Sequence, residues 1–382
     1  MTLTPAFRNI NGRLVLLAVL LLAGAGRQIA KEYKPSVLRP GLHMYAYVAN
    51  TGDGTVTAVD LVNLNVAATI AVGPAPSGVR AHPTRDEIWG VSSAGGYVWV
   101  IDAHKGAVET KLHVGEGAFA LDFSPDGHRA YVASSATGII SAIDCRSRRV
   151  VGTGQAGRRP WLARATPDGQ LIVIPNRDDA TITLLDANTL ASVATIGVAS
   201  GPEQVVILPD GSKAFVAAFG ANQVSVVDLK RKVLLPNLPL GAHPSDLIPK
   251  ADEAKLYVPS ADSHGVSILD TWTNEVSEHI VLGSAPAQGT VETLKEPREA
   301  LLYVSDAAAE SVVPVQVRFR QVMKPIHVGQ RPGVLRFSPG EEMLLVVNEG
   351  SEDLAVIRSR TRSLLTLIPL GSKPRDLAIK VF

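Results

Sequence analysis

A strand-like segment that ends in aspartate recurs along the chain at a constant interval. Its aspartates are Asp60, Asp102, Asp144, Asp186, Asp228 and Asp270, with a constant spacing of 42. The same β-pattern continues around Gln316 and Arg358, at spacings of 46 and then 42, although the acid is lost there. A period of this length is typical of repeat architectures in which every repeat forms one small structural unit.

Other markers recur in phase with the aspartates. Gly-x-x-Pro sequences begin at Gly73, Gly157, Gly241, Gly283, Gly329 and Gly371, Tyr-Val pairs begin at Tyr47, Tyr131, Tyr257 and Tyr303, and Pro-Asp-Gly turns begin at Pro125, Pro167 and Pro209. Pro-Asp-Gly suits a tight hairpin with its glycine in the left-handed conformation. Each unit therefore contains four short strands, the composition of a β-propeller blade. No long helical pattern follows the N-terminal region, so the fold class is all-β.

The number of blades follows from arithmetic. Residues 43–382 number 340, which is eight repeats of 42 plus a four-residue insertion between Asp270 and Gln316. The repeats begin inside a blade, with the second strand at 43–50, and end at 374–382 with a first strand that has no successors. We therefore predict eight four-stranded blades, with the C-terminal strand completing the first blade. Such closure removes the open sheet edges that favour aggregation.

These residues resemble the YVTN-repeat β-propeller family of bacteria and archaea. The resemblance rests on Tyr47-Val48-Ala49-Asn50, on the V-x-V-x-D strand ends, on Val-Gly-x-x-Pro and on Ser-Pro-Asp-Gly at 124–127. It covers the chain from residue 43 onward and implies a propeller of the exported or surface-layer-like kind. Related propellers include lactonases of the phosphogluconolactonase type and haem d1-binding domains. Seven blades are commoner among such relatives, and seven is the alternative to the count of eight.

The N-terminal region has the pattern of an export signal. Arg8 and Arg13 precede an apolar run at 14–26, and this run is shorter than the roughly 20 residues that a membrane-spanning helix needs. Ala23-Gly24-Ala25 supplies the small residues that a signal peptidase recognises. We expect a signal peptide at 1–25, a linker at 26–42 and the propeller at 43–382. The alternative is an uncleaved anchor on the outer side of the cytoplasmic membrane; otherwise the protein is periplasmic or extracellular.

Composition excludes several kinds of site. With 37 basic and 36 acidic residues the net charge is +1, which disfavours a dedicated nucleic-acid binder. A single cysteine, Cys145, excludes an internal disulfide and any cysteine-based metal cluster. The nearby Arg146, Arg148 and Arg149 raise the question of a lowered thiol pKa. A small buried side chain is the interpretation we favour for Cys145.

The recurrent aspartates are expected to be structural. Each is followed by turn-forming residues, and an aspartate there accepts backbone N–H groups in an Asx-turn. With one per blade, the aspartates are spaced around the ring and do not converge. The sequence also lacks the GxSxG, Walker, GxGxxG, HExxH and EF-hand patterns, and the histidines form no metal-binding motif. No cofactor or metal is predicted.

The candidate binding residues lie in the Gly-x-x-Pro loops, which lead into the innermost strands. The loops at 74–77 and 284–287 carry only small or apolar residues, as a purely structural repeat would. Eight positions elsewhere depart from this pattern: Arg158, Arg159, Trp161, Glu203, His243, Arg331, Lys373 and Arg375. They predict a ring at the channel mouth that is richer in cations than in acids. Arginine guanidinium groups, which can donate two parallel hydrogen bonds, and the face of a tryptophan ring suit an anionic or peptide-like ligand.

Two classes of function follow. The favoured one is an exported, non-enzymatic binding or scaffold propeller that presents this loop face to an unknown protein or small anionic ligand. The alternative is a lactonase-like hydrolase, or a protein that handles haem d1 or a quinone. A lactonase needs convergent acids and a histidine, for which Glu203, His243 and Asp246 are the candidates. A haem site needs an axial histidine, and only His243 has the right phase.

Overall fold

The computed structural model describes residues 43–241, 243–250, 254–283, 285–294 and 300–382. The signal peptide and linker expected at 1–25 and 26–42 lie outside these residues. Within the described part no helix is long and apolar enough to cross a membrane.

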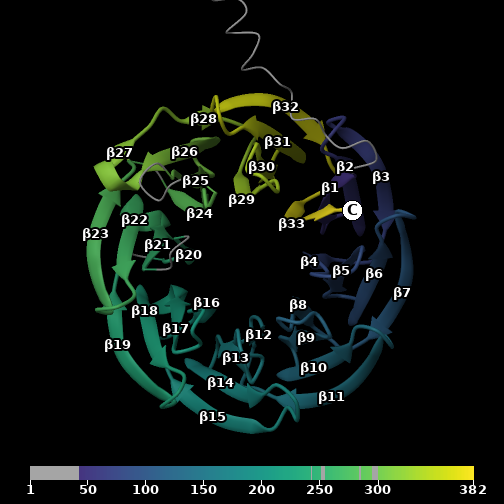
Figure 1. The fold of residues 1–382 in the computed structure, drawn as a ribbon, viewed down its shortest axis with the longest axis vertical. Coiled ribbons are helices and arrows are strands. Elements are labelled where there is room, and N and C mark those ends of the chain that lie inside the picture. The colour runs from purple at the N-terminus through teal and green to yellow at the C-terminus, as the bar shows by residue number, and fades with distance from the viewer. Residues whose placement is uncertain (1–42, 242, 251–253, 284, 295–299) are drawn as a thin grey trace, which may run out of the picture. The chain divides into compact units, whose positions relative to one another are not determined.

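The described residues form eight antiparallel sheets arranged as blades around a central opening (Figure 1). The predicted eight-bladed, all-β propeller is confirmed. In blades 2 to 8 the chain runs outward from the innermost strand, whereas in blade 1 the innermost strand is the last one of the chain. The loop face carries the loops that join strand two to strand three and each blade to the next. The turn face carries the turns from strand one to two and from three to four.

The first four blades contain the following strands, from the centre outward. Blade 1 has β33 (Pro374–Val381), β1 (Met44–Asn50), β2 (Thr55–Asp60) and β3 (Asn65–Ala71). Blade 2 has β4 (Pro76–Ala81), β5 (Glu87–Ser92), β6 (Tyr97–Asp102) and β7 (Ala107–His113). Blade 3 has β8 (Ala118–Phe123), β9 (Arg129–Ser134), β10 (Ile139–Asp144) and β11 (Arg149–Gln155). Blade 4 has β12 (Arg164–Ala165), β13 (Leu171–Asn176), β14 (Thr181–Asp186) and β15 (Ser192–Gly197).

The other four blades include three short 3₁₀ helices. Blade 5 has β16 (Pro202–Ile207), β17 (Lys213–Ala218), η1 (Phe219–Ala221), β18 (Gln223–Asp228) and β19 (Val233–Pro239). Blade 6 has β20 (Ile248–Pro249), β21 (Lys255–Ser260), η2 (Ala261–Ser263), β22 (Gly265–Asp270) and β23 (Glu275–Val281). Blade 7 has β24 (Pro286–Val291), β25 (Leu302–Asp306), β26 (Ser311–Gln316), η3 (Val317–Phe319), β27 (Gln321–Val322) and β28 (Ile326–His327). Blade 8 has β29 (Pro332–Phe337), β30 (Met343–Asn348), β31 (Asp353–Arg358) and β32 (Ser363–Pro369).

The C-terminal strand closes the ring as predicted. β33 pairs with β1 from Met44 opposite Val381 to Asn50 opposite Pro374. Beyond the strand ends, His43 and Phe382 exchange two backbone hydrogen bonds of 3.0 Å. Both residues therefore lie on the turn face of blade 1.

The hydrophobic core lies between neighbouring blades. One cluster combines Trp89 and Val100 of blade 2 with Val132, Ile143 and Cys145 of blade 3, all of them fully buried. The middle strands of each blade are buried at most positions, whereas the outermost strands are largely exposed. Each blade is thus stabilised mainly by packing against the next, which makes closure of the ring important for stability.

The recurrent aspartates close turns as expected. Asp60 accepts the N–H groups of Val62 and Asn63 at 2.8 and 3.0 Å. The backbone N–H of Thr189 and its hydroxyl lower the pKa of Asp186 in the equivalent turn of blade 4. The glycines of the Pro-Asp-Gly turns, Gly127, Gly169 and Gly211, have φ of 71°, 69° and 65°, as predicted.

Two innermost strands are shorter than the repeat predicts. The repeat places the first strand of blade 4 at 161–165, directly after the Gly-x-x-Pro loop, but β12 contains only Arg164 and Ala165. The opposing strand has Pro175, whose carbonyl accepts the Trp161 N–H at 3.0 Å but which has no N–H to return. Blade 6 repeats this arrangement with Pro259 opposite Ser245, and its β20 also has two residues. A proline in the second strand therefore interrupts the inner ladder of both blades.

Candidate functional site

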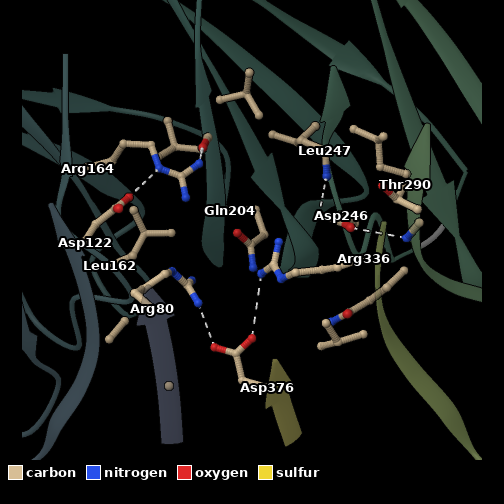
Figure 2. Close-up of a pocket in the computed structure, with 18 of the residues that line it drawn as sticks. Arg80, Asp122, Leu162, Arg164, Gln204, Asp246, Leu247, Thr290, Arg336 and Asp376 are labelled. Atoms are coloured by element: carbon tan, nitrogen blue, oxygen red, sulfur yellow. Dashed lines mark hydrogen bonds and ion pairs between the residues drawn. The ribbon is translucent and has the colours of Figure 1, made fainter. Parts of the chain in front are cut away.

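The innermost strands enclose a central channel of about 510 Å³. Its wall includes six charged side chains from six blades: Arg80, Asp122, Arg164, Asp246, Arg336 and Asp376 (Figure 2). Each follows the loop-face proline of its blade, or the residue equivalent to it, by two or four positions. Because alternate residues of a strand share one face, these positions point toward the channel.

Asp376 binds two of the arginines. Its carboxylate lies 2.7 Å from Nη1 of Arg80 and 3.7 Å from Nη2 of Arg336, and accepts the N–H of Val79 at 3.1 Å. Burial opposes ionisation of this carboxyl, but the two guanidiniums and the backbone donors hold its pKa below the ordinary value. Asp376 is therefore an ionised anchor on β33.

Arg164 bridges three adjacent blades. Its Nε donates to Oδ2 of Asp122 at 3.1 Å, and its Nη1 donates to the carbonyl of Val205 at 2.6 Å. Nη2 of Arg164 has no hydrogen-bond partner among the described residues. This guanidinium is thus held rigidly with donor capacity left toward the channel.

Among Arg80, Arg164 and Arg336, the guanidinium of Arg336 makes the fewest hydrogen bonds. Its Nε donates to the carbonyl of Leu377 at 2.7 Å, and neither Nη group makes a hydrogen bond within the described part of the chain. Burial lowers the pKa of this arginine; Arg80 adds to that effect, while Asp376 opposes it. The guanidinium remains charged, as arginine does in proteins, and would gain from an anionic partner.

Asp246 lies across the channel from these pairs (Figure 2). Its carboxylate accepts the N–H groups of Leu247 and Gly289 at 2.8 and 3.4 Å. No described cation lies within 4.0 Å of it, and burial raises its pKa despite these bonds. The channel therefore combines N–H groups of Arg164 and Arg336 that make no hydrogen bond to a described residue with the Asp246 carboxyl, which can accept a hydrogen bond from a ligand.

Two aromatic side chains form part of the same lining. The rings of Phe119 and Trp161, from blades 3 and 4, lie 4.6 Å apart and are tilted by 52°. The guanidinium of Arg177 stacks over Trp161 at 5.5 Å and forms a 2.6 Å ion pair with Glu203. Burial raises the pKa of Glu203, against the opposing effect of Arg177. Trp161 is thus fixed on both sides.

The predicted loop-face residues separate into two groups. Trp161 and Arg375 line the channel. Arg158 and Arg159 instead line a second, more open pocket of about 650 Å³ between blades 3 and 4, where they pair with Asp179 and Asp178. Asp178 and Asp179 are thus both engaged with arginines.

Three more of the predicted residues, Arg331, His243 and Lys373, also contact an acidic residue. Arg331 lies 3.7 Å from Glu349, and Nδ1 of His243 contacts Asp262. The His243 ring also lies 4.6 Å from that of Phe219. The backbone N–H of Lys373 donates to Glu352 at 3.3 Å. The rim is therefore less cationic than its arginines alone suggest.

The rim residues share an unusual backbone conformation. Arg159, His243, Arg331 and Lys373 have φ between 51° and 56°, where two other blades have Gly117 and Gly201. The carbonyl of this residue accepts an N–H from its own blade, as Arg159 does from Arg177 at 3.1 Å. The fold requires a left-handed residue here, and only some blades use glycine for it.

Cys145 and the histidines show no reactive arrangement. Burial raises the pKa of Cys145 to about 12, so the possibility of a lowered thiol pKa is wrong and the buried interpretation holds. The described residues contain no cluster of histidine, cysteine and acidic side chains that would hold a metal ion.

Arg80, Arg164 and Arg336 are not among the residues predicted from the sequence. Each lies four positions after the loop-face proline of its blade, beyond the positions from which the candidates were drawn. A charged residue inside an otherwise apolar innermost strand, as in Trp-Leu-Ala-Arg-Ala at 161–165 or Gly-Val-Leu-Arg-Phe at 333–337, marks the channel wall. Asp246 had been singled out, but only as a catalytic acid.

Comparison with protein-family profiles gives no match, and comparison with curated protein sequences gives none either. Solved structures do match. The dihydro-haem d1 dehydrogenase NirN in complex with DHE is similar with a TM-score of 0.74 and 18% identity, over 87% of this chain and 74% of that one. AztD from Citrobacter koseri matches with a TM-score of 0.67 and 12% identity, over 89% and 98%. Hydrazine synthase of Kuenenia stuttgartiensis matches with 0.57 and 17%, over 74% and 95%. At these identities the similarity shows the propeller fold alone.

Proposed function

We propose that this protein binds a small organic anion in its central channel and does so without catalysis. The main support for this proposal is that Arg164 and Arg336 line the same channel of about 510 Å³ and each has N–H groups without a hydrogen-bond partner among the described residues. Cavities of this size hold drug-sized ligands. Guanidinium groups bind carboxylates through two parallel hydrogen bonds, which gives both affinity and orientation.

The remaining lining supports a more specific ligand class. Asp246 suits a hydroxyl or amino group on the ligand, because it has no cationic partner among the described residues. The ring pair Phe119–Trp161 offers an apolar face to a planar group. We therefore propose a planar carboxylated molecule that enters from the loop face past Trp161 and Arg375. The other predicted loop residues would act at most as a rim that the ligand crosses.

A tetrapyrrole carboxylate belongs to this class, and the similar structure NirN is a dihydro-haem d1 dehydrogenase in complex with DHE. The described residues that line the channel include no histidine, cysteine or methionine, so they do not fit axial ligation of a haem iron. His243 does not line the channel. We therefore propose that the carboxylates of the ligand contact the channel arginines, without coordination of a metal ion by the protein.

We further propose that the chain is an exported YVTN-type propeller. The repeat markers and the apolar run at 14–26 support this assignment. Mass spectrometry of the protein from its native host tests it, since cleavage after Ala25 would leave Gly26 as the first residue. An intact N-terminus on protein released in soluble form would contradict it.

The binding proposal is tested by identifying what the channel holds. Native mass spectrometry of protein purified from its host should show an adduct that is lost in the Arg164→Gln/Arg336→Gln variant. Arg331→Gly is the matched control, because this loop-face arginine lies outside the channel lining. An adduct that persists in the channel variant, or that disappears in the control, would contradict the proposal.

A further inference from the structure

The turns between the third and fourth strands differ sharply around the ring. In blades 5, 7 and 8 they carry exposed cations, which we call the basic rim: Lys230, Arg231, Lys232, Arg318, Arg320, Arg358, Arg360 and Arg362. The equivalent turns of blades 1 and 4, at 61–64 and 187–190, contain no cation. All of these turns lie on the turn face.

The basic rim is largely uncompensated. Arg320 forms a 2.8 Å ion pair with Glu278, whereas the other seven cations have no ion pair within 4.0 Å among the described residues. Blades 2 and 3 carry fewer unpaired cations in this turn, because Lys105 pairs with Asp102 and Arg148 pairs with Glu87 and Glu109. In blade 3 the exposed Arg146 and Arg149 have no ion pair among the described residues. Seven unpaired cations of these turns thus lie on blades 5, 7 and 8, against two on blade 3.

Exposed apolar side chains accompany the basic rim. Trp272, in the corresponding turn of blade 6, is 83% exposed, and Phe319 of blade 7 is 67% exposed. Leu294, which follows β24 in the turn from strand one to two, is 69% exposed. These are the three most exposed large apolar residues in the described part of the chain, and all lie on the turn face of blades 6 and 7.

The one length irregularity of the repeat falls in the same place. The interval from Pro286 to Tyr303 is longer by four than the equivalent interval from Pro244 to Tyr257, so the insertion lies between β24 and β25. Glu341 of blade 8 accepts the N–H groups of Thr293 and Leu294 at 2.6 and 3.2 Å, which fixes the start of this insertion. The turn from strand one to strand two is thus four residues longer in blade 7 than in blade 6.

The turn face is also where the chain enters the propeller. His43 hydrogen-bonds Phe382 at the turn-face end of blade 1, and the segment 1–42 that precedes it includes the apolar run at 14–26. The first described residue of the propeller, His43, therefore lies on the same face as the basic rim.

We propose that the basic rim with Trp272, Leu294 and Phe319 is a docking surface for an anionic phospholipid bilayer. Clustered arginine and lysine attract acidic headgroups, and tryptophan and phenylalanine side chains insert at the headgroup level. Charge alone would suit any polyanion, but three isolated and exposed apolar side chains among the cations favour a lipid surface.

Vesicle sedimentation with the full chain tests the charge component. Vesicles of phosphatidylcholine with about 30% phosphatidylglycerol should bind the protein more tightly than phosphatidylcholine alone. Lys230→Gln/Arg231→Gln and Arg318→Gln/Arg360→Gln should each weaken binding to the anionic vesicles by about 25-fold, or about fivefold per charge. Arg146→Gln/Arg149→Gln, exposed in the same turn of blade 3, is the matched control and should have little effect.

Lipid-borne quenching tests the apolar component independently of the N-terminal segment. Trp89 and Trp99 are fully buried, so Trp161 and Trp272 report on opposite faces. Brominated phosphatidylglycerol in the vesicles should quench tryptophan fluorescence, and Trp272→Phe should abolish the quenching while Trp161→Phe retains it.

Three results would overturn the proposal. The first is vesicle-bound protein whose Trp272 is not quenched, which would assign binding to the N-terminal segment. The second is equal weakening by the basic-rim and blade 3 variants. The third is tight binding of duplex DNA that the basic-rim variants abolish, without binding to anionic vesicles, which would assign the surface to nucleic acid.

Discussion

Several charged side chains of the channel also connect neighbouring blades, and Asp376 makes contacts with two of the arginines. Its folded pKa lies below the unfolded value, so its stabilising contribution is fully present above the unfolded pKa near 4 and is lost as the pH falls through the folded pKa. Asp376→Asn should lower the free energy of unfolding by about 3 kcal/mol at pH 7, since it leaves Arg80 and Arg336 without their carboxylate. Urea denaturation from pH 7 down to acid should show the deficit shrinking. A constant deficit across this range would contradict the assigned pKa direction.

Asp246 should behave in the opposite sense. Burial raises its folded pKa, so the free energy of unfolding falls as the pH rises from the unfolded pKa through the folded one. Asp246→Asn should therefore raise the melting temperature at pH 7 and have little effect near pH 3. The same variant should weaken the ligand if this carboxyl accepts one of its donors, a trade of stability for function. A lower melting temperature at pH 7 would show that ionised Asp246 is stabilising.

The left-handed conformation of Arg159 on the loop face can be tested by substitution with glycine. Arg159→Gly should leave stability unchanged or raise it by up to about 1 kcal/mol, because φ is 53° there. Arg158→Gly, one residue earlier and without a positive φ, should be destabilising by about 0.5–1 kcal/mol. Thermal melts of the two variants compare them directly. Equal losses would mean that the backbone conformation carries no strain.

At the scale of elements, closure by β33 is the feature on which the ring depends. The strand contributes seven paired positions to β1 and brings Asp376 to the channel. Deleting 373–382 should remove cooperative folding, because blade 1 loses its innermost strand and two arginines lose their partner. Circular dichroism melts and solubility measure this effect. A soluble truncation with a sharp thermal transition would contradict it.

The elements were largely predictable from the sequence because their signals are local and repeated. Asp60 and its equivalents mark turns, and Gly127 and its equivalents mark hairpins, so eight blades and their closure followed from spacing. The shortening of β12 and β20 was not anticipated, although Pro175 and Pro259 were visible. The shortening depends on which strand pairs with the one that contains the proline, and strand pairing cannot be read from the proline alone.

At the scale of the whole molecule, the two faces of the propeller carry different chemistry. The loop face surrounds the channel with Trp161 and Arg375, whereas the turn face carries the basic rim. The channel was harder to predict than the fold because its wall combines single residues from blades far apart in sequence. Asp376 and Arg80, for example, are separated by 296 positions but meet through closure of the ring.

Anion binding by the channel arginines is measured most directly by a thermal-shift titration. A panel of aliphatic and aromatic mono-, di- and tricarboxylates would be titrated into the wild type, Arg164→Gln/Arg336→Gln and Arg331→Gly, each compared with its own ligand-free melt. At least one planar polycarboxylate should raise the melting temperature of the wild type and of Arg331→Gly, and leave the channel variant unchanged. If a ligand stabilises all three proteins equally, or if no member of the panel stabilises any of them, anion binding by the channel arginines is contradicted.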